Sequence, residues 1–172
     1  MTPDRDPIRE AHAQWLRHGW SEAADGMAMV MSVVRVQQLL MERIESVLRP
    51  LDLTFARYEV LRLLSFAHGA MPMTRLGSLL QVHPTSVTSA VDRLVRQGYA
   101  ERLRREGDRR VVLASLTDAG RQVVETATER LNSQVFEQPG LAADDVVRLT
   151  EMLAALRASA GDVVAAPEVT SQ

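Results

Sequence analysis

Positive charge is concentrated in one short stretch of a chain whose formal net charge is −2. Residues 93–110 hold seven arginines against three acidic residues, Glu101, Glu106 and Asp108, so this stretch carries +4 and the rest of the chain −6. Guanidinium groups are planar, permanently charged donors that bind phosphate oxygens well. Charge segregated in this way indicates a surface that binds a polyanion.

The segment before these arginines, VHPTSVTSAVDRLVRQ, combines helical periodicity with small hydroxyl side chains. We expect a helix over residues 84–97 that buries Val87, Val91 and Leu94. Its other face is then formed by Pro84, Thr85, Ser86, Thr88, Ser89 and Arg93. Small side chains let a helix lie deep in a DNA major groove, where hydroxyls donate to or accept from base edges. An ordinary surface helix can have the same composition, so both interpretations stay open for this face alone.

The start of the same helix has a second feature that suits phosphate. Pro84 at the first helical position leaves free backbone N–H groups beyond it, and these groups and the helix dipole can bind an anion. His83 comes directly before the helix. Three roles fit this histidine: it caps the helix, it contacts a phosphate, or it is a plain turn residue.

A β-hairpin is predicted after Gly98, with strands near residues 99–105 and 109–116 and Glu106–Asp108 as the turn. Alternation puts Ala100, Arg102 and Arg104 on one face of the first strand. The tip then carries Arg105, Asp108, Arg109 and Arg110. An arginine at such a tip can enter the narrow minor groove, where the negative potential is strongest. Asp108 either braces the guanidinium of Arg110 or is a solvated turn residue.

The elements that position these residues are mostly helices. The expected helices begin at Pro7, Met27, Phe55, Arg75 and Asp118, and near Ala142. Four of them are directly preceded by a residue that can cap them, in chain order Asp6, Thr54, Thr74 and Thr117. From Phe55 onward, the expected order is a helix, a short helix, a turn, a helix and a hairpin. This is the order of elements in a winged helix-turn-helix. The sequence therefore predicts a mostly α protein with a small β-wing.

The helix expected over residues 27–50 carries more apolar surface than one helix can leave in water. Its apolar stripe consists of Met27, Met31, Val34, Leu40, Ile44 and Leu48. Two interpretations stay open: the stripe packs into the core of its own chain, or it forms a dimer interface.

Composition narrows the classes of protein further. The chain has no cysteine, 46% apolar and 4% aromatic residues, which favours helices and excludes disulfides and thiolate metal sites. The four histidines are scattered, and no phosphate-binding loop or nucleophile elbow is present, so we expect no metal, no cofactor and no enzyme. No signal peptide and no membrane span are expected, which fits a cytoplasmic protein.

The segment GDRRVVLASLTDAGR resembles the wing signature of the MarR (multiple-antibiotic-resistance regulator) family of bacterial transcriptional regulators. The matching residues are Asp108, Arg109, Arg110, Leu116, Thr117 and Gly120. VHPTSVTSAVDRLVRQGYAERL resembles the family's recognition helix and next strand, and LDLTFARYEVLRLL resembles the helix that precedes them. The resemblance covers about residues 27–160.

The resemblance implies an obligate homodimer that binds double-stranded DNA at a pseudopalindrome. It implies N-terminal dimerisation helices at 1–50, a winged helix-turn-helix domain at 51–117, C-terminal dimerisation helices at 118–160 and a flexible tail at 161–172. It assigns the minor groove to Arg110, phosphates to Arg109, and base edges to Thr85, Ser86 and Ser89. Half-sites are expected about 10 bp apart, one turn of the duplex.

The resemblance also implies control by a small molecule. A repressor of this family is expected to release DNA when a ligand, here a small anionic aromatic one, binds between the dimer helices and the winged lobe. Peroxide sensing through cysteine is excluded because the chain has none. The extra N-terminal helix with Trp15 and Trp20 is similar to an extension in relatives that sense urate or other aromatic acids; alternatively, both tryptophans pack on the dimer helices.

A different class of function also fits the residues. A winged-helix module could use its basic wing to bind an acidic protein partner instead of DNA. The two hypotheses can be distinguished by measurement. A sequence-specific DNA-binding protein loses affinity for DNA steeply as salt rises, and it discriminates between duplexes.

Overall fold

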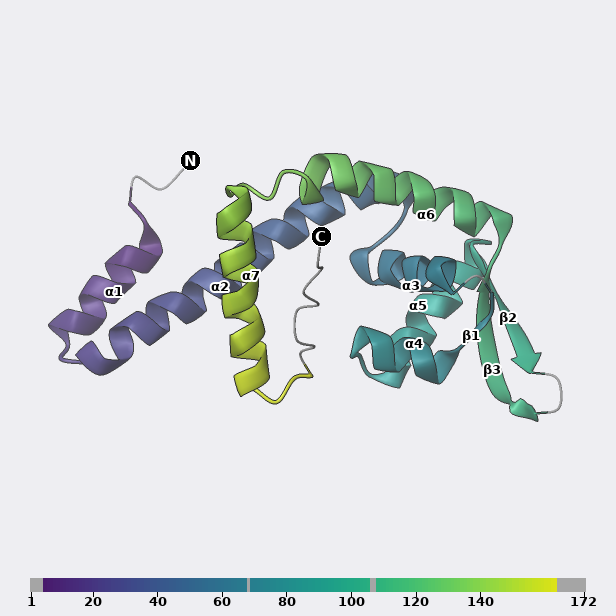
Figure 1. The fold of residues 1–172 in the computed structure, drawn as a ribbon, viewed down its shortest axis with the longest axis horizontal. Coiled ribbons are helices and arrows are strands. Elements are labelled where there is room, and N and C mark those ends of the chain that lie inside the picture. The colour runs from purple at the N-terminus through teal and green to yellow at the C-terminus, as the bar shows by residue number, and fades with distance from the viewer. Residues whose placement is uncertain (1–4, 68, 106–107, 164–172) are drawn as a thin grey trace, which may run out of the picture. The chain divides into compact units, whose positions relative to one another are not determined.

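The computed structural model of the chain describes residues 5–67, 69–105 and 108–163, and the side chains of residues 105 and 108–110 lie outside this description. The helices are α1 (Pro7–Arg17), α2 (Ser21–Leu48), α3 (Phe55–Phe66), α4 (Met73–Leu80), α5 (Pro84–Arg96), α6 (Asp118–Leu131) and α7 (Ala143–Ser159), and the strands are β1 (Met71–Pro72), β2 (Ala100–Arg105) and β3 (Asp108–Leu116) (Figure 1). Two compact units are formed, Met1–Leu131 and Asn132–Gln172.

The predicted winged helix-turn-helix is confirmed in the first unit. Helices α3, α4 and α5 pack together, and the β2–β3 hairpin extends beyond them (Figure 1). The sheet is antiparallel, in the order β1-β3-β2. Strand β1 was not predicted, because its two residues are too short for an alternating pattern. It exists only because Met71 and Pro72 meet Ala114 and Leu113 of β3 in space.

The core of this unit lies where the periodicity of the sequence predicted it. Val87, Val91 and Leu94 on one face of α5 are 2%, 0% and 0% exposed. They are joined in the core by Leu48 of α2, Leu61 and Leu64 of α3, Leu76 of α4, and Val124 and Leu131 of α6, all of them fully buried. Burial of one face of α5 fixes the orientation of its opposite face.

Three of the predicted helix caps are present and one is wrong. Asp6 Oδ1 accepts from the Ile8 N–H at 3.0 Å, and Thr54 Oγ1 accepts from the Arg57 N–H at 3.4 Å. Thr117 Oγ1 caps α6 in the same way. Thr74 does not cap α4, which begins at Met73 after Pro72 with no side-chain cap. The helix starts earlier than predicted because Pro72, with its φ of −60°, is already held in the sheet.

Other helix bounds also differ from those expected. Helix α2 begins at Ser21 rather than Met27, and α6 ends at Leu131, followed by a π-helical turn over Asn132–Phe136. In the sequence, the first strong stop signal after Gly120 is Pro139-Gly140, so the sequence alone would let α6 run up to Pro139. Neither bound, Ser21 or Leu131, is marked by a proline or glycine, so the sequence contains only weak signals for where these helices start and stop.

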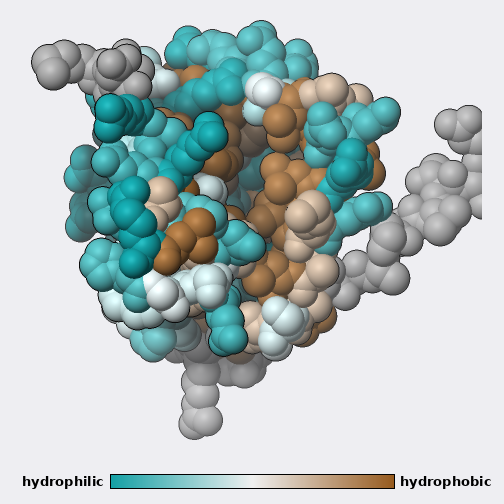
Figure 2. Space-filling view, turned by 90° about the vertical axis from the view of Figure 1, so that its left-hand side faces the viewer, coloured by the Kyte–Doolittle hydropathy of each residue, from teal (hydrophilic) through white to brown (hydrophobic). Residues whose placement is uncertain are grey.

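The apolar stripe of α2 divides into a covered and an uncovered part. Ile44 and Leu48, near the C-terminal end, are 8% and 0% exposed. Met31, Val34 and Leu40 are 49%, 46% and 41% exposed. The space-filling view also shows hydrophobic residues on the surface beside hydrophilic ones (Figure 2). The core of a single chain therefore accounts for only one end of this stripe.

Helix α1 packs beside the N-terminal part of α2. His12 Nε2 lies 2.8 Å from Asp25 Oδ1 of α2. At the corner between the helices, the Trp15 and Trp20 rings meet edge to face at 5.4 Å, and His18 stacks on Trp20 at 5.3 Å. The two tryptophans thus pack on one another, and they stabilise the α1–α2 corner.

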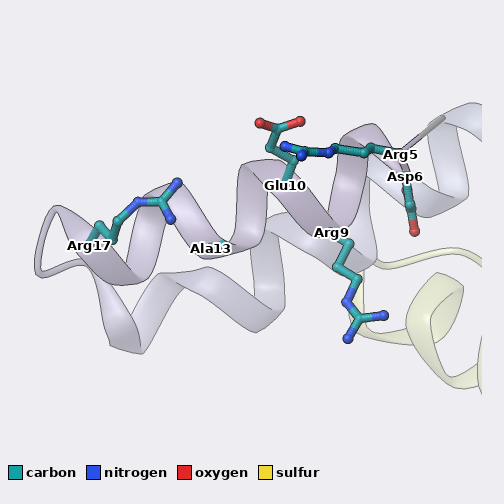
Figure 3. A pocket seen from close by; sticks show the side chains of 6 residues that line it. All are labelled: Arg5, Asp6, Arg9, Glu10, Ala13 and Arg17. Carbon is teal, nitrogen blue, oxygen red and sulfur yellow. The ribbon is translucent and has the colours of Figure 1, made fainter. Parts of the chain in front are cut away.

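A hollow of about 530 Å³ runs along the outer face of α1 (Figure 3). It is lined by Arg5, Asp6, Arg9, Glu10, Ala13 and Arg17. Glu10 and Arg9 point to opposite sides of the helix (Figure 3). Among the described residues, the lining comes from α1 and from Arg5 and Asp6 directly before it, and it contains both signs of charge.

Burial raises the pKa of the Glu59 carboxyl, on α3. A raised pKa in the folded state means that stability is greatest when this carboxyl is protonated, and that it falls as pH rises through the raised pKa. We therefore expect Glu59→Gln to raise the melting temperature at pH 7, measured at matched protein concentration. The gain should vanish near pH 4, where the wild-type carboxyl is also becoming neutral. An equal gain at both pH values would contradict this explanation.

Candidate nucleic-acid interface

The face of α5 opposite the buried valines and Leu94 is exposed along its whole length. It consists of Pro84, Thr85, Ser86, Thr88, Ser89 and Arg93, as the periodicity predicted. The face is short and carries no bulky apolar side chain. Such a helix can approach another surface closely, with hydroxyls and one guanidinium as its polar contacts.

His83 is the N-cap of α5. Of the three roles that the sequence left open for this histidine, the free protein therefore shows the cap. Its ring Nδ1 accepts from the Thr85 N–H at 3.3 Å and lies 3.1 Å from Thr85 Oγ1. Its backbone oxygen accepts from the Ser86 N–H at 2.9 Å. These contacts satisfy N–H groups at the start of the helix and orient the Thr85 hydroxyl.

A hollow of about 420 Å³ lies between α4 and the start of α5. Its lining residues are Met73, Thr74, Gly77, Ser78, Val82, Pro84 and Thr88. Among the residues predicted to read DNA, Pro84 and Thr88 therefore border α4. Thr85, Ser86, Ser89 and Arg93 lie outside the hollow, so the predicted face divides into an edge towards α4 and a free part.

The wing is the hairpin of β2 and β3, and Arg104 is exposed on it, opposite Val112. The pairing shifts between Arg104 and Arg105, and Arg105 then pairs with Asp108. The side chains of Arg105, Asp108, Arg109 and Arg110 lie outside the described part of the structure. The brace between Asp108 and Arg110 therefore stays a prediction.

Arg102 forms an ion pair with another residue of the chain and does not belong to the tip of the wing. Its Nη2 lies 2.8 Å from Asp92 Oδ1 of α5. Ala100, predicted to share its face, is 4% exposed, so that face of the strand points toward the protein at its base. The ion pair fixes the base of the wing to α5. Sequence reasoning missed this pair, although Asp92, an acidic residue directly before the basic stretch 93–110, was a visible signal.

The base of the wing is also fixed to α6, through Thr117 and Gly120. Thr117 Oγ1 donates to the Gly98 oxygen at 2.7 Å and accepts from the Gly120 N–H at 3.0 Å. The Thr117 N–H donates to the Tyr99 oxygen at 3.2 Å. A Cβ at Gly120 would lie 1.9 Å from that Tyr99 oxygen. The resembling segment LTDAG thus has a physical reason: it lets α6 begin directly against the first residues of the wing.

No group of three or more histidine, aspartate or glutamate residues in the described ranges could hold a metal ion. None of the described helices is long and apolar enough to cross a membrane.

We expect Ser86→Ala and Ser89→Ala to change base preference more than overall affinity. A hydroxyl at a base edge discriminates between bases, and loss of one such contact costs about 1 kcal/mol at the contacted base pair. The measurement is binding to the preferred duplex and to single-base variants of it. Ser32→Ala, on α2, is the matched control, since its hydroxyl donates to Ala28 within its own helix. Uniform weakening on all duplexes would instead make the two serines backbone contacts.

Comparison with known proteins gives one consistent result. The family model described as MarR family matches residues 53–112, which contain α3, α4, α5, β2 and part of β3. The multiple antibiotic resistance protein MarR of Escherichia coli is 33% identical over 108 residues, which are 62% of this chain and 74% of that protein.

Solved structures agree with the sequence comparison. The MarR family transcriptional regulator Sco5413 from Streptomyces coelicolor matches with a TM-score of 0.73 at 42% identity, over 82% of this chain and 99% of that one. A mutant of MarR from E. coli, solved in complex with operator DNA, matches with a TM-score of 0.71 at 27% identity, over 78% and 96%. The similarity thus extends to a protein whose structure includes its DNA.

Proposed function

The chain belongs to the MarR family of transcriptional regulators, and from this premise we propose that it binds a pseudopalindromic operator as a homodimer and represses transcription. It is a DNA-binding regulator and not an enzyme. The observation that carries the proposal is the exposed hydroxyl face of α5, fixed by the Arg102–Asp92 ion pair to a wing rich in arginine. Helix and wing can then contact one DNA duplex together.

The proposed contacts follow the chemistry of each side chain. Thr85, Ser86 and Ser89 contact base edges in the major groove. Pro84, Thr88 and Arg93 position the helix against the backbone. Arg110 enters the minor groove, Asp108 orients it, and Arg104, Arg105 and Arg109 contact phosphates. The E. coli relative in complex with its operator supports this arrangement by overall similarity.

The homodimer is proposed from the uncovered apolar surface of two helices. Met31, Val34 and Leu40 of α2 are exposed. Val147, Met152 and Leu156 of α7 are 58%, 68% and 43% exposed. Large exposed apolar surface indicates a partner, and a second copy of the chain supplies the symmetry that an inverted repeat requires.

The proposal also includes regulation: a small anionic aromatic ligand releases the protein from its operator. Such a ligand relieves repression only if it binds better to a dimer whose two α5 helices are wrongly spaced for successive major grooves. An inverted repeat read by a two-fold dimer tolerates little change in that spacing, because both helices must reach their half-sites together.

The test is selection of binding sites from a random duplex library by the full chain at near-physiological salt, with sedimentation to measure its oligomeric state. Recovery of an inverted repeat with half-sites about 10 bp apart, by a dimer, is the expected result. A folded dimer that enriches no sequence, and whose binding to duplexes shows no preference, would favour the protein-adaptor alternative. A monomer would refute the dimer.

A further inference from the structure

Four polar side chains connect the C-terminal end of α5 to the corner between α2 and α3. Asp52 follows the 3₁₀ turn Arg49–Leu51 in a left-handed conformation, with φ of 50°. Gln97, the C-cap of α5, donates from Nε2 to the backbone oxygen and to Oδ2 of Asp52, each at 2.8 Å. Arg57 Nη1 donates to Gln97 Oε1 at 2.8 Å. We call Asp52, Arg57, Arg93 and Gln97 the Asp52 cluster.

The two arginines of the Asp52 cluster are held differently. The Arg57 side chain is 12% exposed, and its Nε donates to Thr54 Oγ1 at 3.2 Å, so its donors are committed to the protein. The Arg93 side chain is 53% exposed, and its Nη2 lies 3.9 Å from Asp52 Oδ2. That distance is too long for a hydrogen bond. Arg93 is therefore attracted to Asp52 by charge without being locked to it, and its guanidinium is free to turn to another anion.

Arg93 also ends the exposed face of α5. We propose that Asp52 competes with DNA phosphate for Arg93, and thereby sets the DNA affinity of this face. In the free protein Arg93 stays near the Asp52 carboxylate, and on DNA it exchanges this carboxylate for a phosphate oxygen. The Asp52 side chain is 68% exposed, so solvent and salt screen its direct repulsion of a phosphate, and it acts on DNA binding through Arg93. This inference rests on the proposed function, because it assumes that α5 binds DNA.

The structure separates the charge of Asp52 from its role in anchoring α5. Gln97 is held by the backbone oxygen of Asp52 as well as by its carboxylate. Asparagine tolerates the left-handed conformation and keeps a side-chain oxygen that can accept from Gln97. Asp52→Asn therefore removes the competing charge and keeps an acceptor for Gln97. It also removes the charge that lies 4.0 Å from Arg57 Nη2, but the hydrogen bonds from Arg57 to Gln97 and Thr54 remain.

The test compares wild type, Asp52→Asn, Arg93→Ala and the double variant on the duplex that the full chain selects. Exposed ion pairs are weak and screened by salt. We expect Asp52→Asn to bind about threefold more tightly at ~0.05 M salt, with the gain lost near ~0.5 M, and the salt dependence to steepen by up to about one unit because one more cation is available to phosphate. An unchanged melting temperature excludes a merely structural effect.

The double variant decides whether Asp52 acts through Arg93. If it does, Asp52→Asn gains nothing in the Arg93→Ala background. An equal gain in both backgrounds, or no loss of affinity in Arg93→Ala alone, would overturn the inference. Glu22→Gln is the matched control, because it removes one negative charge at the far end of α2, about 40 Å from Asp52 by helix rise, and should leave affinity unchanged. If the wild-type protein prefers no duplex, the proposed function itself is contradicted. If the wild type binds one duplex specifically but Asp52→Asn binds it no more tightly, only this inference is contradicted.

Discussion

Replacement of Gly120 by alanine is expected to lower the stability of the protein more than the same replacement at any other glycine that the structure describes. The new Cβ would lie 1.9 Å from the Tyr99 oxygen, a backbone atom that accepts from the Thr117 N–H. Either the start of the wing or the start of α6 must shift. We expect a loss of about 3 kcal/mol, at the upper end of overpacking costs, and a melting temperature lower by roughly 10 °C.

Gly26→Ala is the matched control for this prediction. Gly26 lies in α2, and nothing is within 4 Å of the position that a Cβ would take. Alanine there should be neutral or stabilising by about 0.4–1 kcal/mol. Thermal unfolding of the two variants at equal concentration gives the comparison. A melting temperature of Gly120→Ala within about 2 °C of wild type would show that the junction yields easily and that the wing is not pinned to α6.

Arg110→Ala is expected to weaken DNA binding by roughly 10- to 100-fold while leaving the protein folded. An arginine in the minor groove contributes about 1–3 kcal/mol, and its loss removes a desolvated, planar cation from the region of strongest negative potential. The measurement is fluorescence anisotropy on the selected duplex across a salt series. The salt dependence should become shallower by about one unit.

Two further variants make the assignment of Arg110 specific. Arg110→Lys keeps the charge but not the planar guanidinium, so its affinity should fall between alanine and wild type. Arg17→Ala removes an exposed arginine from α1 and should change affinity less than about twofold, since isolated surface charges contribute little. If Arg110→Ala and Arg17→Ala weaken binding equally, the minor-groove role of Arg110 is wrong.

Repeating patterns of residues predicted the architecture well because they report local structure. The valines and Leu94 of α5 recur at helical spacing, and the caps at Asp6, Thr54 and Thr117 lie within three residues of the N–H groups they satisfy. The order of these elements predicted the winged helix-turn-helix. Strand β1 and the start of α4 escaped the prediction because the partner of Pro72, Leu113, lies some 40 residues away.

The sequence alone determined the residue types of the candidate interface, namely hydroxyls and Arg93 on one face of α5 and arginines on a hairpin. Only the tertiary structure decided how those charges are used. Arg102 is paired with Asp92, and Arg93 lies near Asp52, 41 positions earlier in the chain. Helical and strand periods specify which side of an element a residue occupies, but an ion pair depends on which elements pack together. The number of arginines was therefore visible from the sequence, whereas their availability to DNA is a property of the fold.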